Sequence, residues 1–219
     1  MTSHLSPDDI LIIVPARGGS KGIPRKNLAP FRGEPLIRHT LDAVRQLPDF
    51  CNVLVSTEDA EIRDYCESQG FSSGYHRPHE LAGDDSPIAD VLMHGYEWMR
   101  DFCGRDFRYI MMLQATSPLR TPGHIREFTD RLFAQPAKSL ISVSPMTEHP
   151  MECLTVRSPN QPWEYLVDPP ADSSGRQSYV GKYYYINGAM YVAEPEFLRE
   201  KHSFLVPGVT ELFVMPREF

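Results

Sequence analysis

The sequence predicts an α/β fold, a three-layer sandwich in which helices cover both faces of a mainly parallel sheet. Short apolar runs typical of buried strands alternate along the chain with segments whose apolar residues recur at helical spacing. The chain has 219 residues, of which 41% are hydrophobic, as in an ordinary globular domain. We therefore expect a single domain over residues 1–219.

Four elements are expected at the start of the chain. DILIIVPA (9–16) is almost continuously apolar and is followed by glycines, which is typical of a strand buried on both faces. PLIRHTLDAVRQL (35–47) has an apolar helical face and begins with Pro35, which suits a first helical turn. NVLVST (52–57) predicts a second buried strand, and DAEIRDYCESQG (59–70) predicts a polar helix that ends at its glycine.

The same alternation continues along the chain. SPIADVLMHGYEWM (86–99) predicts a helix with Ser86 as its N-cap. YIMMLQ (109–114) predicts a buried strand, TPGHIREFTDRLF (121–133) a helix that starts at a Thr-Pro signal, and SLISVS (139–144) another strand. This order favours parallel pairing, because helical crossovers connect parallel strands.

The character of the sequence changes between residues 145 and 182. This segment is rich in proline, serine and other polar residues and contains two short strand-like pieces, CLTVR and WEYLV. We interpret it as a β-arm inserted into the domain, followed by a mobile loop near residues 168–180. Beyond it, YYINGAMYVA (184–193) predicts a strand interrupted by Asn-Gly, and ELFVMP (211–216) predicts the last strand.

Composition argues against several classes of protein. A net charge of −7 and a pI near 5.6 argue against a nucleic-acid partner or any general polyanion partner. The four cysteines form no C-x-x-C pair, which fits reduced thiols rather than disulfides or a zinc site. The first residues lack a signal-peptide pattern, and runs such as ILIIV are too short to cross a membrane. We expect a cytoplasmic protein without a membrane partner.

The segment VPARGGSKGIPRKN (14–27) concentrates positive charge in this acidic chain. It follows the first expected strand and holds three glycines and four cations, Arg17, Lys21, Arg25 and Lys26. Glycine backbones approach phosphate closely, and cationic side chains neutralise it. The spacing matches neither the Walker A loop nor G-x-G-x-x-G. The segment therefore predicts a different triphosphate loop, with a solvated basic connector as the alternative.

This loop and five later stretches resemble the acylneuraminate cytidylyltransferases, or CMP-sialic acid synthetases. The later stretches are VLVSTED (53–59), RPHELAGDDSP (77–87), LQATSPLRT (113–121), GRQ (175–177) and INGAMYVA (186–193). The resemblance implies a Rossmann-like nucleotidyltransferase that transfers CMP from CTP, bound with Mg²⁺, to the anomeric 2-hydroxyl of a sialic acid-like sugar, releasing pyrophosphate. It also implies that the arm at 145–182 makes a homodimer, in which the neighbour covers the sugar end of each site.

The resemblance also implies roles for individual residues. Arg17 and Lys21 are the implied catalytic residues, with Lys21 offsetting charge on the departing pyrophosphate. The implied CTP contacts are Ala16, Arg17, Gly18, Gly19, Ser20, Lys21, Lys26, Asn27, Arg77 and Ser86. The implied sugar contacts are Gln114, Arg176, Gln177, Tyr185 and Asn187.

Structural alternatives stay open for several of these positions. Arg77 either contacts nucleotide or forms a surface ion pair with Glu80. Ser86 caps a helix, contacts nucleotide, or does both. Arg120 either steadies the loop it ends or touches a ligand, and Tyr185 either contacts the sugar or packs in the core.

Some features of the reaction stay unassigned. Members of this family carry two Mg²⁺-binding aspartates after the last strand, whereas this chain ends at MPREF, before that segment. The protein ligands of the metal are therefore not predicted, and a catalytically impaired nucleotide-binding or regulatory homologue is the alternative function. The sugar, whether sialic, legionaminic, pseudaminic or another nonulosonic acid, stays open.

Overall fold

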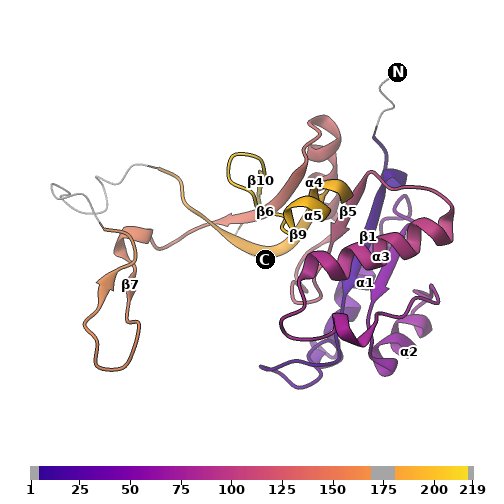
Figure 1. Ribbon diagram of the computed structural model, residues 1–219, viewed down its shortest axis with the longest axis horizontal. Helices are drawn as coiled ribbons and strands as arrows, with labels where there is room; N and C mark the ends of the chain where they lie inside the picture. The colour runs from indigo at the N-terminus through magenta and orange to yellow at the C-terminus, as the bar shows by residue number, and fades with distance from the viewer. Residues whose placement is uncertain (1–4, 169–180, 217–219) are drawn as a thin grey trace.

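The computed structural model describes residues 5–168 and 181–216 of the chain (Figure 1). The strands of its central sheet are β1 (Ile10–Pro15), β4 (Val53–Ser56), β5 (Tyr109–Met112), β6 (Ser139–Pro145), β9 (Tyr184–Ala193) and β10 (Glu211–Val214). They lie in the order β10-β6-β9-β5-β1-β4. Within this sheet β1 pairs in parallel with β4 and β5, and β6 with β10, while β9 runs antiparallel to β5 and β6. The predicted, mainly parallel sheet is confirmed.

Helices cover both faces of the sheet and complete the three layers. They are α1 (Leu36–Arg45), α2 (Ala60–Ser68), α3 (Ile88–Cys103), α4 (Pro122–Ala134) and α5 (Pro195–Lys201). Side chains of α1, α2 and α4 pack in one buried cluster, and those of α3 and α5 pack in a second cluster across the sheet. In the described part of the chain, no helix combines the length and the apolar character that a membrane span requires.

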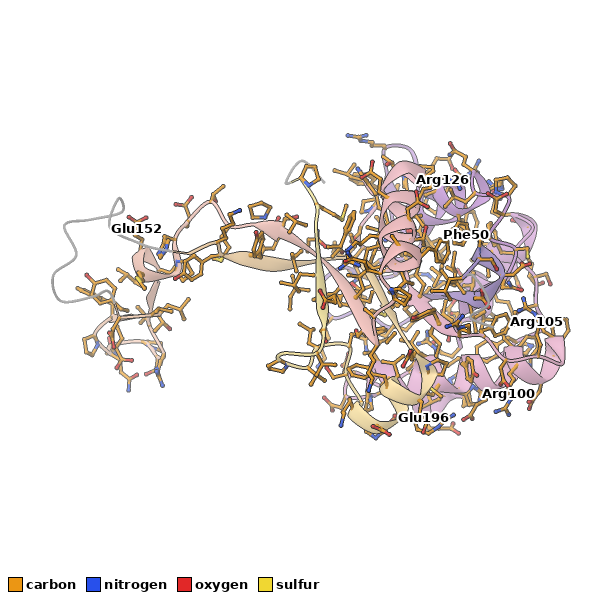
Figure 2. The ribbon with its side chains drawn as sticks, turned by 90° about the horizontal axis from the view of Figure 1, so that it is seen from above. Phe50, Arg100, Arg105, Arg126, Glu152 and Glu196 are labelled. Atoms are coloured by element: carbon orange, nitrogen blue, oxygen red, sulfur yellow. The ribbon has the colours of Figure 1, made fainter. Side chains whose placement is uncertain are left out.

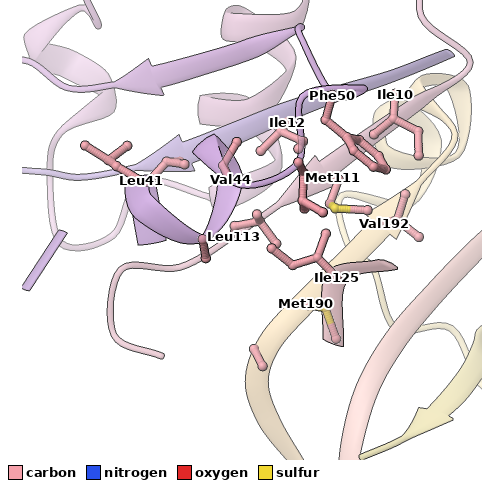
Figure 3. Close-up of a cluster of buried hydrophobic side chains, with 14 of the residues drawn as sticks. Ile10, Ile12, Leu41, Val44, Phe50, Met111, Leu113, Ile125, Met190 and Val192 are labelled. Carbon is pink, nitrogen blue, oxygen red and sulfur yellow. The ribbon is translucent and has the colours of Figure 1, made fainter. Parts of the chain in front are cut away.

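The central strand β1 shows why the sequence folds in this way. Ile10, Ile12 and Val14 point into the cluster with α1, whereas Leu11 and Ile13 point into the other cluster. All five side chains are buried, so the strand is apolar at every position rather than at alternate ones. Figure 3 shows the first cluster, where side chains of β1 meet those of α1, β5 and β9.

The start of α3 differs from the prediction. The helix begins at Ile88, and Pro87 occupies the N-cap position without a side-chain capping bond. Ser86 therefore precedes the N-cap, and its hydroxyl donates instead to the carbonyl of Glu80 at 3.1 Å. The predicted Thr-Pro start of α4 is confirmed, and the hydroxyl oxygen of Thr121 accepts from the backbone N–H of His124.

Several short elements complete the body. β2 (Pro30–Phe31) and β3 (Glu34–Pro35) form an antiparallel hairpin that leads into α1. Short 3-10 helices lie at Pro7–Asp9, His79–Leu81 and Pro150–Glu152. Pro35 is the N-cap of α1 rather than a residue of its first turn. The sequence did not predict the β2–β3 hairpin, α5 or the 3-10 helices.

The predicted arm projects away from the body (Figure 1). Its described part contains the antiparallel pair β7 (Leu154–Thr155) and β8 (Glu164–Tyr165), which matches the two strand-like pieces. Figure 2 shows Glu152 on this arm, far from Arg100 and Arg126 on the body. The loop expected near 168–180 lies almost entirely outside the described residues.

Candidate functional site

A cavity of about 260 Å³ opens beside the carboxyl ends of β1 and β5. Three segments line it: the loop after β1, the stretch before and into α3, and the loop after β5. In parallel α/β sheets, this edge is where ligands bind. The predicted site residues that line the cavity are Arg17, Gly19, Lys26, Asn27, Arg77, Ser86 and Gln114.

The loop after β1 is tied down at its start. The Gly18 amide donates to Oε1 of Glu58 at 2.7 Å. A Cβ at Gly18 would lie 2.3 Å from Oδ2 of Asp59, so only glycine fits this approach. The buried amide of Asn27 donates to the carbonyl of Arg17 at 2.9 Å. These contacts fix the backbone of the loop at Arg17 and Gly18. Asn27 therefore stabilises the loop in addition to lining the cavity.

Two loop cations converge on a single carboxylate. Nη1 of Arg17 lies 2.7 Å from Oδ1 of Asp84, and Nζ of Lys21 lies 2.9 Å from its Oδ2. Arg17 also donates to the carbonyl of Gly83 at 3.2 Å. The hydrogen bond from Lys21 and the contacts with Arg17 hold the pKa of Asp84 below its usual value. This carboxylate is therefore ionised at neutral pH.

Arg77 forms part of the wall of the cavity. The residue is only 5% exposed, and its Nε donates to the hydroxyl of Ser56 at 3.0 Å. Its guanidinium also donates to the Ser56 carbonyl and lies 3.7 Å from a carboxylate oxygen of Glu58. Burial lowers the pKa of Arg77, and the Glu58 carboxylate opposes that shift. The alternative of a surface ion pair with Glu80 is wrong.

The loop after β5 carries Gln114 to the cavity and is held by Arg120. The buried Arg120 guanidinium donates to the carbonyls of Gln114, at 3.3 Å, and Ala189, at 2.6 Å, and to the hydroxyl of Thr40 at 2.8 Å. Burial lowers its pKa to about 9, which leaves it charged at neutral pH. Arg120 thus steadies the loop that it ends, which is one of the two alternatives expected from the sequence. Gly188 lies beside the side chain of Gln114 at φ +75°, a backbone conformation that favours glycine, and a Cβ there would lie 3.4 Å from Oε1 of Gln114, at ordinary contact distance.

Other predicted residues lie outside the lining of the cavity. Ala16 is buried below the loop, and Ser20 is half-buried within it. Asn187 accepts from the hydroxyl of Ser142 at 2.7 Å and donates to that of Ser144 at 2.9 Å, so its amide is engaged within the sheet. Tyr185 is exposed on β9, which excludes the core-packing alternative. Arg176 and Gln177 lie outside the described residues.

Comparison with known proteins gives the family. Residues 11–165 match the sequence model of a family described as Cytidylyltransferase. The chain is a member of the cytidylyltransferase family. The match covers the loop after β1, the segment that carries Arg77 and Asp84, and the loop that carries Gln114.

Individual relatives agree with this membership. The chain is 32% identical over 213 residues to an N-acylneuraminate cytidylyltransferase of Streptococcus agalactiae, covering 95% of this chain and 49% of the relative. The chain thus spans about half the length of that relative. It is also 32% identical over 200 residues to a CMP-N,N'-diacetyllegionaminic acid synthase of Legionella pneumophila, covering 89% of this chain and 82% of that one.

A solved structure resembles the fold of this chain. It is a CMP:2-keto-3-deoxy-manno-octonic acid synthetase complexed with CTP, with a TM-score of 0.67 and 16% sequence identity. The superposition covers 94% of this chain and 90% of that chain. At this identity the likeness bears on the fold, and it confirms the predicted fold class.

The sequence did not identify two acidic residues that contact the loop after β1. Glu58 meets Gly18 across a separation of 40 residues, and Asp84 meets Arg17 and Lys21 across the cavity. Both lie in stretches that carried the resemblance, VLVSTED and RPHELAGDDSP. Their partners lie on other segments, and only the folded chain brings these together.

The described side chains do not assemble a metal site. Across residues 5–168 and 181–216, no group of three or more histidine, cysteine, aspartate or glutamate side chains is placed to hold a metal ion. Three carboxylates beside the loop are already engaged, Glu58 by Gly18 and Arg77, Asp59 by Arg25, and Asp84 by Arg17 and Lys21. Among the described residues, the site thus presents several cations and no cluster of ligands for a divalent metal.

Proposed function

We propose that the protein transfers CMP from CTP to the anomeric 2-hydroxyl of a sialic acid-like nine-carbon α-keto acid sugar, releasing pyrophosphate. The observation that carries this proposal is the gathering of Arg17, Lys26 and Arg77 on one cavity, with Lys21 at Asp84 on its rim. The chain is acidic overall, so this local concentration of positive charge fits one highly anionic substrate. The family and the relatives' names agree with the proposal.

The proposed chemistry relies mainly on positioning and on stabilisation of charge. The sugar oxygen attacks the α-phosphorus of CTP, and the bond to the β-phosphate oxygen breaks. Negative charge then grows on the leaving pyrophosphate, where a fixed cation lowers the barrier. We assign this role to Lys21, with Arg17 as its neighbour, because both side chains lie on the same side of the loop at Asp84.

We assign the sugar end of the cavity to Gln114. Its amide both donates and accepts hydrogen bonds, which suits hydroxyl and acylamino groups. Gly188 lies against the Gln114 side chain and leaves room beside it, since it has no Cβ. The amide of Asn187, the residue before Gly188, is hydrogen-bonded to the hydroxyls of Ser142 and Ser144 and so anchors this part of β9 to β6. The sugar contacts assigned to Tyr185, Arg176 and Gln177 stay predictions.

Mg²⁺ is proposed to enter with CTP as the counterion of the triphosphate. Such a metal usually keeps several waters and binds through substrate phosphates and one or two carboxylates. When bound, it would neutralise charge on the phosphates, in addition to the cations of the loop.

We further propose a homodimer that works in the cytoplasm. Leu154, Val156, Trp163, Tyr165 and Leu166 are exposed on the described arm, which fits a surface that a second copy covers. The four cysteines, all within the described residues, are free thiols, as in a reducing compartment.

Pyrophosphate release tests the proposed function. The purified full chain is incubated with CTP, Mg²⁺ and each member of a panel of nonulosonic acids that includes N-acetylneuraminate and N,N'-diacetyllegionaminate. We expect release that depends on both CTP and one of the sugars. CTP binding without turnover on any sugar of the panel would contradict the proposal and favour a nucleotide-binding homologue without activity.

A further inference from the structure

We propose that Asp84 is a built-in counter-anion: it holds Arg17 and Lys21 together when no nucleotide is bound, and the phosphates of CTP displace it. The inference rests on the proposed function, since it assigns these two cations to phosphate. It adds a residue that sets how tightly the site binds its substrate and its pyrophosphate product.

The geometry of the ion pairs supports an exchange. Each oxygen of the Asp84 carboxylate contacts a different cation, Oδ1 with Arg17 at 2.7 Å and Oδ2 with Lys21 at 2.9 Å. A phosphate group offers the same arrangement, because it presents several oxygens to cations on either side. Asp84 itself lines the cavity. The carboxylate thus stands where a phosphate would meet the same two side chains.

Asp84 and an incoming phosphate cannot keep the same partners. With both oxygens in use, the carboxylate satisfies the cations while its charge repels an approaching anion. The side chains of Asp84 and Arg17 are each about one-third exposed, and that of Lys21 is 78% exposed. These partly solvated contacts are weak enough to exchange. Binding of phosphate therefore includes the breaking of two ion pairs.

The backbone of the loop is held by contacts that phosphate binding need not disturb, and only the side chains of Arg17 and Lys21 have to change partner. Gly18 is fixed from below by Glu58, and Asn27 is buried and bonded to the Arg17 carbonyl. Neither contact involves the side chains of Arg17 or Lys21. The backbone therefore stays in place while the two side chains change partner from a carboxylate to a phosphate.

Asp85 provides a matched control for Asp84. It is the neighbouring aspartate and is also exposed, and no ion pair to it is found in the described part of the chain. Asp84→Asn and Asp85→Asn change the net charge equally at nearly the same place. A difference between them therefore reports the contacts of Asp84 and not the overall field of the protein.

The test measures the affinity of the full chain for inorganic pyrophosphate by calorimetry. We expect Asp84→Asn to lower the Kd by roughly fivefold, since two exposed ion pairs no longer compete. Asp85→Asn should change the Kd by less than about twofold, and Asp84→Glu, which keeps the charge, should stay nearer the wild type. The gain in Asp84→Asn should disappear when Lys21→Ala is added.

The outcomes separate this inference from the function on which it rests. If the wild type binds neither pyrophosphate nor CTP, the proposed function fails and the exchange fails with it. If the wild type binds pyrophosphate but Asp84→Asn binds it no more tightly than Asp85→Asn, the exchange alone is overturned. Thermal unfolding of each variant confirms that the compared proteins are folded.

Discussion

At the scale of single residues, the charged side chains divide into buried supports and exposed cations. Arg77 and Arg120 are buried and bonded to backbone carbonyls and hydroxyls, so Arg77 forms part of the cavity wall and Arg120 holds the loop that carries Gln114. Lys21 has 78% of its side chain exposed and contacts only the carboxylate of Asp84 among the described residues. The exposed side chain of Lys21 can therefore move with the phosphate group to which its charge is assigned.

This division leads to a prediction for Lys21. Lys21→Ala should lower turnover at least tenfold, which corresponds to about 1.4 kcal/mol in the barrier, because charge on the leaving pyrophosphate loses its partner. The measurement is kcat at saturating CTP. Lys201→Ala, on α5 and away from the cavity, is the control and should leave kcat unchanged. An unaltered rate for Lys21→Ala would remove this lysine from the mechanism.

A second residue-scale prediction concerns Cys66. Burial raises the pKa of its thiol to about 12, so almost no thiolate exists at neutral pH. Cys103 is exposed. A short pulse of iodoacetamide should alkylate Cys103 and spare Cys66 in the native protein, as read by peptide mass spectrometry. In denaturant both should react, and equal labelling in the native state would contradict the burial of Cys66.

Part of the lining of the cavity was predictable from the sequence, whereas the partners of its residues were not. Glycines and cations directly after a buried strand predict a phosphate loop, because they are contiguous in the sequence. The sequence could not show that Arg77 meets Glu58 rather than Glu80. That choice depends on how the chain after α2 returns to the end of β4, a long-range arrangement that local spacing does not encode.

At the scale of elements, prediction succeeded where burial leaves a continuous signal. β1 and β5 are covered on both faces and almost continuously apolar, which is the signal that predicted them. β9 and β10 were also predicted, although several of their apolar side chains are exposed. The direction of β9 was not found, because an apolar run looks the same for either direction of pairing. The helix α5 was missed because its seven residues are too few to show a period.

The junction of β1, its loop and α2 gives a prediction for Gly18. Gly18→Ala places a Cβ 2.3 Å from Asp59, whose side chain caps α2 through the Ile62 amide. Displacing this cap should lower the free energy of unfolding by about 1 kcal/mol and the Tm by roughly 2–4 °C. Gly19→Ala is the matched control for stability, since no atom lies within 4 Å of its new Cβ. Equal Tm values for the two variants would show that the approach at Gly18 is not tight.

At the scale of the whole molecule, the body and the arm differ in how they are stabilised. The body has two buried clusters, one on each side of the sheet. The described arm instead exposes large apolar side chains on a two-stranded pair, and an isolated pair of this kind is at best marginally stable in water. A partner that covers the arm would bury its apolar side chains and stabilise the two-stranded pair.

Solution mass tests this proposal. A chain of 25.0 kDa should elute in light-scattering chromatography with about twice that mass. Replacing Trp163 and Leu166 with aspartate should shift the mass to that of a monomer, because charge then lies on the apolar surface. Phe102→Asp, at an exposed position of α3, introduces the same charge elsewhere and should leave the dimer intact. A monomeric wild type would rule out the arm as a dimer contact.

The pairing of β6 with β9 has a consequence for how such a chain can change. The two strands are antiparallel neighbours that pair out to Pro145 and Tyr184, where the arm begins and ends, with one shift of register between Ile141 and Val143. In topological terms, the arm of more than thirty residues is the connection of a β-hairpin formed by β6 and β9. Two antiparallel strands need a connection of only about two residues. Its length can therefore grow or shrink, in evolution or in engineering, without altering the register of the sheet. A short Asn-Gly connection in place of residues 147–182 would yield a minimal core that keeps the cavity beside β1 and β5 and lacks the arm that we propose as the dimer contact.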